Sequence, residues 1–243
     1  MKTPYHYKAT FAILIFLALM TTGLYSCKKD DAPASTTTVT EADAVELATD
    51  AVVPADGGMV LQVNNSVMIY QTAAIDCGVA KDSAIAGSSA SGATPSYSYA
   101  LNWNYLLTCS GVVPSLLTFN FSGESKYDGV HMSSNDSSTG NFVLTGITPT
   151  ATAYTLNTTY TRNGSQTSKI ARNNSFSSKM SIESSNITVD KTSLKILSGE
   201  ATIAISGSST SGSSFSYSGT LTFLGNDKAT LVLNSGTSYT IVW

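Results

Sequence analysis

The sequence predicts a mainly β protein: a single large antiparallel meander sheet (a curled sheet, half-barrel or sandwich) with one or two N-terminal helices packed on it. From Ile75 onward, apolar and polar residues alternate in many short runs that turn residues separate. Successive strands joined by short loops pair as antiparallel neighbours, so a meander is the most economical topology. The residues before Ile75 show helical spacing instead.

The first 26 residues have the three parts of a signal peptide. Lys2 and Lys8 lie in a basic start, residues 9–20 are nearly all apolar, and small and polar residues follow. A membrane-spanning helix needs about 20 apolar residues, and this run is shorter. We therefore expect residues 1–26 to be a signal peptide.

Residues 24–27, Leu-Tyr-Ser-Cys, resemble the lipobox of bacterial lipoproteins. In a lipobox, a branched apolar residue and a small residue precede a cysteine that is acylated and becomes the first residue. The resemblance implies a covalent lipid on Cys27, whose chains favour membrane attachment by about 0.8 kcal/mol per buried methylene. The membrane is thus an expected partner, through Cys27.

Residues 27–39 are expected to be a lipid-anchored flexible tether, since they are charged and then rich in Ala, Ser, Thr and Pro. The run Lys28-Lys29-Asp30-Asp31 looks like the acidic export tag of lipoproteins displayed on the outer face of the outer membrane. It fits a simple solvated tether almost equally well. We expect the protein at the outer membrane, on the cell surface or on the periplasmic face.

Charge and cysteine content restrict the partners. Without residues 1–26, the chain keeps 11 basic and 16 acidic residues, a net charge near −5, so nucleic acid is not expected as a partner. About 215 residues suffice for one β domain. Cys77 and Cys109 are an even pair in an exported chain, which favours a disulfide. A metal site is disfavoured, because His131 is the only histidine after residue 26 and no CxxC motif exists.

Residues 40–75 are the expected N-terminal helical segment. Thr40 can cap a helix whose first turn is acidic. The apolar residues at helical spacing are Ala44, Leu47, Ala48 and Ala51, which leaves Glu46, Thr49 and Asp50 outside. Pro54 and Gly57-Gly58 end this helix. From Met59 to Ala74 helical and alternating patterns overlap, and we favour a second helix.

Residues 76–243 are the expected antiparallel β domain. Its clearest strand is 96–109, with one face made by Tyr97, Tyr99, Leu101, Trp103, Tyr105 and Leu107. Further alternating runs are 117–121, 154–160, 176–182, 203–205, 221–223, 231–233 and 239–243. Asn163-Gly164 predicts a tight hairpin turn, and Asp128-Gly129 and Asn135-Asp136 are also typical turn formers.

Two segments of the β domain are similar to each other. Residues 87–99, GSSASGATPSYSY, recur as residues 207–219, GSSTSGSSFSYSG. Each copy predicts a strand, a Gly/Ser loop and a second strand. One interpretation is a duplicated binding loop; the one we favour is two hairpins that share a flexible, low-complexity turn.

Several segments together resemble a family of exported bacterial lipoproteins that has no assigned activity. They are PADGGM, CGVAKDSAIA, the Trp-containing strand that closes at Cys109, FNFSGESKYDGVHMSSND, NTTYTRNGSQTSK and SYSGTLTFLGNDKATLVLNSGTSYTIVW. The resemblance covers most of the chain after residue 27. It implies a lipid-anchored, disulfide-bearing, mostly β domain and brings no catalytic residues.

The sequence does not predict an enzyme, a metal or a cofactor. A hydrolytic triad needs a base beside its nucleophile, and His131 lies in a strand-to-loop stretch. Glu124, Asp128 and Asp136 are the closest acids in the β region, and two of them belong to expected turns. Asp128, Asn135 and Asp136 match no EF-hand spacing for calcium.

Two non-catalytic functions remain. The preferred one is a surface interaction or structural protein that binds glycans or other surface proteins, with Tyr and Trp exposed on a sheet face. The other is a periplasm-facing carrier or chaperone-like lipoprotein that shelters an apolar ligand under a curved sheet. A cavity lined by Trp103, Phe119 and Phe121 would support the carrier. Their strict alternation with polar residues favours a place in the core instead.

Overall fold

The computed structural model describes residues 38–170 and 174–243. The expected signal peptide, Cys27 and all of the tether except residues 38 and 39 lie outside these residues, and their assignments stay predictions. Among the described helices, none is long and apolar enough to cross a membrane.

Two α-helices precede the sheet, as predicted: α2 (Glu41–Val52) and α3 (Met59–Thr72), with the short 3₁₀ helix η1 (Pro54–Asp56) between them. A capping box starts α2, in which the Thr40 side chain accepts from the Asp43 N–H and the Asp43 carboxylate accepts from the Thr40 N–H. Gly58 permits the sharp turn before α3, because a Cβ there would lie 2.5 Å from the carbonyl oxygen of Val53.

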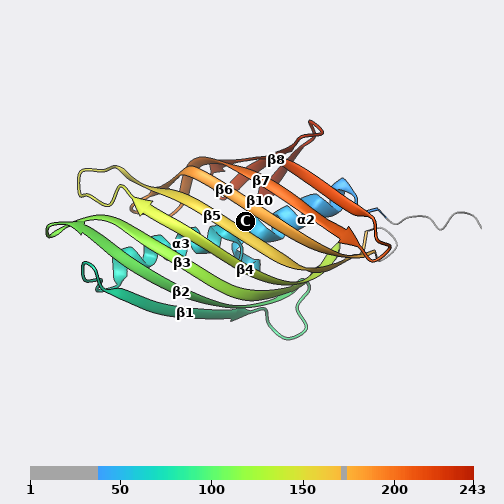
Figure 1. The fold of residues 1–243 in the computed structure, drawn as a ribbon, viewed down its shortest axis with the longest axis horizontal. Coiled ribbons are helices and arrows are strands. Elements are labelled where there is room, and N and C mark those ends of the chain that lie inside the picture. Colours follow the sequence, from blue (N-terminus) through green and yellow to red (C-terminus); the bar gives the residue numbers. More distant parts are fainter. Residues whose placement is uncertain (1–37, 171–173) are drawn as a thin grey trace, which may run out of the picture. The chain divides into compact units, whose positions relative to one another are not determined.

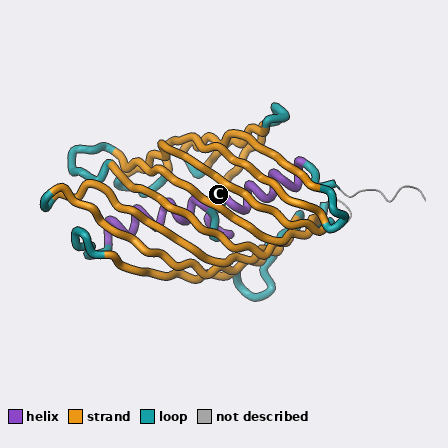
Figure 2. The backbone as a smooth tube through the Cα atoms, in the orientation of Figure 1, coloured by secondary structure: helices purple, strands orange, loops and turns teal. Residues whose placement is uncertain are grey.

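Ten strands in chain order form one antiparallel meander sheet, which confirms the predicted fold class. The strands are β1 (Ala80–Ser88), β2 (Ser96–Ser110), β3 (Val113–Asp128), β4 (Met132–Thr145), β5 (Ala153–Ser168), β6 (Ser175–Asp190), β7 (Ile196–Ser209), β8 (Ser214–Gly225), β9 (Lys228–Leu233) and β10 (Ser238–Val242). Strands β1 and β10 are the two edges, so the sheet is open. It curls around the helices, as Figures 1 and 2 show.

The alternation of residues gives the sheet an apolar inner face and a polar outer face. In β2, the inner residues Leu101, Trp103, Tyr105 and Leu107 are buried as predicted. The core lies between this face and the helices, and the indole N–H of Trp103 donates to Oε1 of Gln62 in α3 over 2.7 Å. Full burial of a side chain such as Phe119 contributes roughly 1.5–3 kcal/mol.

Two predicted turns are wrong. Asn163-Gly164 lies within β5 and Asn135-Asp136 within β4, a strand that the alternating runs did not include. Asn163 is paired on both sides, with Ser137 and Lys179, so it belongs to the interior of the sheet. The glycine at position 164 is explained by a close contact and not by a turn, since a Cβ there would lie 1.8 Å from Oδ1 of Asp136. Asp128-Gly129 does lie where β3 ends and the chain turns.

The hairpins define two ends of the sheet. The proximal end carries the β1–β2, β3–β4, β5–β6, β7–β8 and β9–β10 connections, and the described chain begins there: the Tyr217 hydroxyl donates to the Val39 carbonyl over 2.9 Å. The distal end carries the other connections and the predicted disulfide, Cys77–Cys109, with Cα atoms 5.7 Å apart. In the chain-entropy model such a crosslink contributes roughly 3–4 kcal/mol.

Candidate functional site

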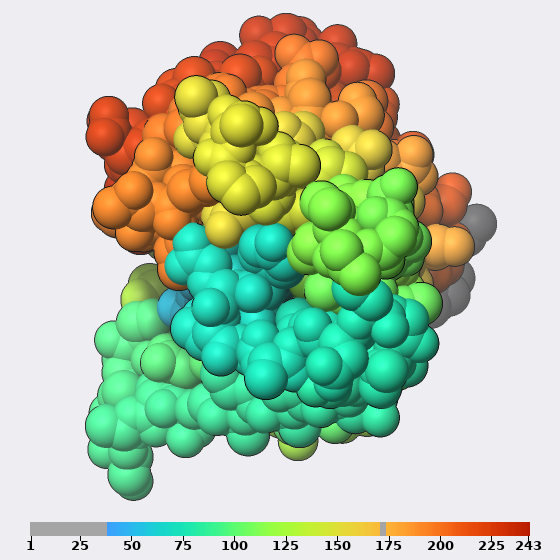
Figure 3. All heavy atoms as spheres, turned by 90° about the vertical axis from the view of Figure 1, so that its left-hand side faces the viewer, coloured from blue at the N-terminus to red at the C-terminus, as the bar shows by residue number. Residues whose placement is uncertain are grey.

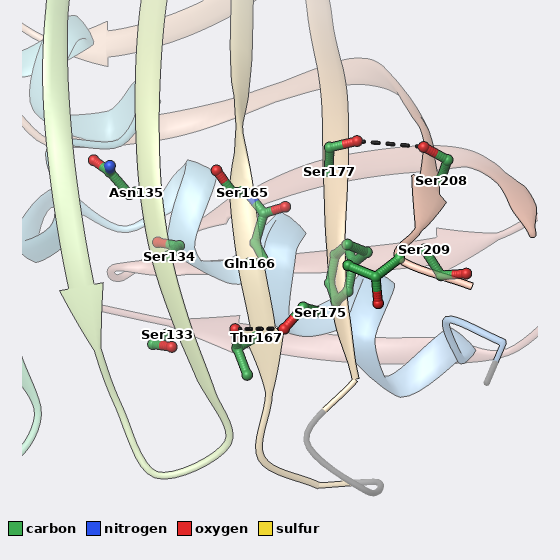
Figure 4. Close-up of a pocket in the computed structure, with 12 residues that line it drawn as sticks. Ser133, Ser134, Asn135, Ser165, Gln166, Thr167, Ser175, Ser177, Ser208 and Ser209 are labelled. Atoms are coloured by element: carbon green, nitrogen blue, oxygen red, sulfur yellow. Dashed lines mark hydrogen bonds between the residues drawn. The ribbon is translucent and has the colours of Figure 1, made fainter. Parts of the chain in front are cut away.

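The outer face carries a groove of about 610 Å³ near the proximal end, which crosses β4, β5, β6 and β7 (Figure 4). We call it the hydroxyl groove. Its exposed and half-exposed lining residues are Ser133, Asn135, Ser165, Thr167, Ser175, Ser177, Ser208 and Thr210. The lining residues Ser134, Gln166, Phe176 and Ser209 alternate with them along the strands and are buried.

The register of the strands arranges these side chains in two rows. The first row crosses four strands through the register partners Asn135, Ser165, Ser177 and Ser208. The second contains Ser133, Thr167 and Ser175. Strands lie about 4.8 Å apart and alternate residues of one strand about 6.8 Å apart, so the groove presents a regular lattice of polar groups.

Within the lattice, hydroxyls of neighbouring strands contact each other. Oγ1 of Thr167 lies 3.0 Å from Oγ of Ser175, and Oγ of Ser177 lies 3.4 Å from Oγ of Ser208 (Figure 4). Each hydroxyl offers one donor and two acceptor lone pairs and rotates to suit its partner. None of the described residues that line the groove carries a charge at neutral pH. The groove is therefore suited to a neutral, hydroxyl-bearing ligand.

A charged cluster lies buried on the inner face of the same strands. Nη2 of Arg162 lies 2.8 Å from Oδ2 of Asp136, whose Oδ1 accepts from Nε2 of Gln166 over 2.7 Å. Nη1 of Arg162 donates to the carbonyl oxygen of Asp50, in α2, over 2.7 Å. Arg162 and Asp136 are only 5% and 4% exposed. This set, with Asp56, is called the Arg162 cluster below, and it joins α2 to the sheet.

Asp50 was expected on the outside of its helix, and that prediction is wrong: it is 3% exposed. The reason is that the sheet curls over this side of α2 and Arg162 reaches it. Burial raises the pKa of the Asp50 carboxyl well above its ordinary value; Arg162 lowers it, and the charges of Asp56, Glu46 and Asp136 raise it further. Its Oδ2 has no hydrogen-bond partner.

The pKa of Asp56 is raised by the same main cause as that of Asp50. Burial raises the pKa of Asp56 to about 6, against the opposing effect of Arg162 and with smaller contributions from Glu46 and Asp136. The cluster thus holds three carboxyl groups against one guanidinium. We infer that its charge changes just below neutral pH.

The three aromatic residues that would line a ligand cavity in the carrier interpretation lie together in the core. Trp103, Phe119 and Phe121 are 4%, 0% and 4% exposed. Ring centroids are 5.8 Å apart for Trp103 and Phe119, and Phe121 packs on Phe142 at 5.7 Å. This packing gives the carrier interpretation no support. It also removes the exposed Trp and Tyr face that was expected for glycan binding, since the large rings of β2 point inward.

The acids weighed for calcium or catalysis are held apart. Asp128 pairs with Lys169 at 2.5 Å, whereas Asp136 pairs with Arg162 on the inner face. Nδ1 of His131 lies 3.7 Å from Oε2 of Glu46. Among the described residues, no group of three or more His, Cys, Asp or Glu side chains could hold a metal ion.

Both copies of the internal repeat form hairpins, but in different registers. Gly87 of β1 pairs with Tyr99, whereas its counterpart Gly207 pairs with Phe215. The two paired residues are therefore four positions closer in sequence in the second hairpin than in the first. This difference favours two similar turns over a duplicated binding loop.

We did not predict the hydroxyl groove or the Arg162 cluster from the sequence, although the alternation of inward and outward positions along the strands indicates both. Arg162 is in phase with the apolar positions Leu156 and Tyr160 of its strand, and Asp136 is in phase with Phe142. A charge at an inward position requires a buried partner. The exposed and half-exposed groove residues of β5, Ser165 and Thr167, are the out-of-phase polar positions of the same strand.

Comparison with protein-family models, with curated proteins and with solved structures finds no match for this chain.

Proposed function

We propose that the protein is a non-catalytic binding protein, anchored to the outer membrane through lipid on Cys27, whose outer sheet face binds a neutral surface glycan in the hydroxyl groove. The observation that carries this proposal is the uncharged double row of hydroxyl and amide groups, of which one row crosses four strands and the other crosses three. Glycans carry many hydroxyl groups, and each can both donate and accept hydrogen bonds.

Rigidity of the sheet supports a binding role. The groove lies on central strands, each paired on both sides, and the Arg162 cluster ties the inner face of β4 and β5 to α2. Groups held on regular strands lose little conformational freedom when a ligand binds. Gln166 belongs both to the cluster and to the lining of the groove.

The test is binding of the purified full chain to a panel of neutral and charged glycans. The double variant Ser165→Ala/Ser177→Ala removes one hydroxyl from each of two neighbouring strands in the groove. Two lost hydrogen bonds at about 0.5–1.5 kcal/mol each predict roughly fivefold to a hundredfold weaker binding. The matched control is Ser98→Ala/Ser122→Ala, two exposed serines of the outer face on β2 and β3, which do not line the groove.

Loss of binding in the groove variant alone supports the proposal. Equal binding of both variants, or a panel without any ligand, contradicts it. The anchor has a separate test: Cys27→Ala should release the protein from membranes, and protease treatment of intact cells, with a periplasmic protein as leakage control, should degrade the mature domain. Retention of Cys27→Ala in the membrane would contradict the anchor.

A further inference from the structure

A second concave site lies at the distal end of the domain. A cleft of about 440 Å³ separates the Val60–Met68 face of α3 from the β6–β7 connection at residues 193–196, from Asp227 and from Trp243. We call it the distal cleft. Figure 3 looks onto this end of the domain, where the cyan residues around the end of α3 lie between teal-green residues below and yellow and orange residues above.

Two neighbouring side chains of the cleft hold polar atoms that the protein does not satisfy. Asn65 is 4% exposed, and its Nδ2 donor has no hydrogen-bond partner. The Oδ1 acceptor of Asn64 is also buried without a partner. An unsatisfied buried polar group costs roughly 1–3 kcal/mol, and native proteins contain few of them. One free donor and one free acceptor on adjacent residues are the complement of a secondary amide, which has one C=O and one N–H.

Part of the remaining wall is apolar and aromatic. Trp243 packs edge-on against Phe223, with centroids 6.1 Å apart, and its backbone N–H donates to the Asp227 carbonyl over 3.1 Å. Met68, which is 43% exposed, also lines the cleft. The indole and the thioether together offer surfaces for an apolar ring face and a methyl group.

Charged groups stand at the same cleft. Nζ of Lys195 lies 2.5 Å from Oδ2 of Asp227, and their side chains are 56% and 34% exposed. A partly exposed ammonium and carboxylate can donate to and accept from ligand hydroxyls. The volume lies within the usual range for small-molecule sites, roughly 300–1,000 Å³.

We propose that the distal cleft binds an N-acetylated hexosamine residue. Both amide atoms are buried, so each side-chain amide turns toward the cleft when the ligand binds. The acetamido carbonyl then accepts from Asn65, the acetamido N–H donates to Asn64, the sugar ring lies against Trp243, and ring hydroxyls meet Lys195 and Asp227. This proposal does not rest on the hydroxyl groove, which lies on the outer face near the other end of the sheet.

The test is fluorescence titration of the full chain with N-acetyl-D-glucosamine. The protein has two tryptophans, and Trp103 is buried at 4% exposure, so a ligand-dependent change reports on Trp243. We expect a saturable change with N-acetyl-D-glucosamine and at least tenfold weaker binding of D-glucose, which lacks the amide. N-acetylglycine methylamide, which has the amide without the ring, should also bind at least tenfold more weakly.

The decisive variant is Asn65→Leu, with Asn102→Leu on the outer face as the matched control. Asn65→Leu should weaken binding at least tenfold without lowering the melting temperature, because its free donor has no protein partner to lose. The groove variant Ser165→Ala/Ser177→Ala should bind N-acetyl-D-glucosamine normally, which separates this site from the hydroxyl groove. No saturable change, equal binding of D-glucose or of the methylamide, or undiminished binding by Asn65→Leu would overturn the proposal.

Discussion

Two regions of the inner face are stabilised in different ways. Around Phe119, the rings of β2, β3 and β4 pack with centroids about 6 Å apart and need only apolar neighbours. Around Arg162, a buried cation depends on Asp136 and on a carbonyl of α2. Apolar packing tolerates small errors in position, but a buried charge does not, so the second region fixes how α2 sits on the sheet.

The largest expected effect comes from breaking the charged region. Arg162→Met should lower the free energy of unfolding by about 3–5 kcal/mol, because it leaves Asp136 buried without its cation. Urea unfolding followed by circular dichroism measures this change. The double variant Arg162→Met/Asp136→Leu should regain at least half of the loss. A single-variant loss under 1 kcal/mol would show that the pair does not hold the structure.

The substitution Gly164→Ala should also disturb the Arg162 cluster, because the added methyl group would collide with the neighbouring strand β4. A Cβ there would lie 1.8 Å from Oδ1 of Asp136 and 2.6 Å from the carbonyl oxygen of Asn135. Gly164→Ala should therefore cost about 2–3 kcal/mol by forcing the carboxylate from Arg162. Gly164 does not have a positive φ, so the cost should come from these contacts alone, and the same substitution in an Asp136→Ala background should cost less. Equal unfolding of Gly164→Ala and wild type would contradict the close packing.

The aromatic region should respond more gently to a change of shape. Phe119→Leu should cost about 1–2 kcal/mol, from lost buried area and a small cavity, since flanking rings can move into part of the space. This loss should be the same at pH 5 and pH 7.5, because no titratable group is removed. A loss that depended on pH would mean that the two regions are coupled.

The smallest expected effect is the pH dependence of the charged region. A carboxyl group whose pKa rises on folding binds its proton more tightly in the folded state. Its ionised form therefore destabilises the folded state, and this effect is absent below the pKa of the unfolded state and complete above the pKa of the folded state. For Asp56 this window runs from 3.8 to about 6. When the pH is lowered from 7.5 to 5, the free energy of unfolding of the wild-type protein should rise by on the order of 1 kcal/mol more than that of the Asp56→Asn variant. Urea unfolding of both proteins across this range is the measurement, and identical pH profiles would contradict it.

The same contrast explains what the sequence could predict. The alternation in β2 placed Trp103 inward, and helical spacing placed α2 and α3, because burial of apolar area follows the period of the chain. Strand β4 was missed because residues 133–138 are all Ser, Asn or Asp, and the inward Asp136 is paired with Arg162 of the neighbouring strand. Asn163-Gly164 has the composition of a turn, and only the position of Asp136 on the next strand explains the glycine.

The binding surfaces were harder to predict than the core. The hydroxyl groove requires the register of four strands, which brings Asn135 and Ser208 into one row although they lie 73 positions apart. The distal cleft requires α3 to meet connections from the end of the chain. The individual residues of these sites are of common types, and only the fold brings them together into one surface.

The most direct test of the proposed function is to map a bound glycan on the protein by nuclear magnetic resonance. The Cys27→Ala protein, labelled with ¹⁵N, would be titrated with the best ligand from the glycan panel while backbone amide shifts are followed. The proposed groove predicts shifts that concentrate at residues 133–135, 165–167, 175–177 and 208–210. Unchanged amides in these four segments, with a bound glycan mapped elsewhere, would contradict it.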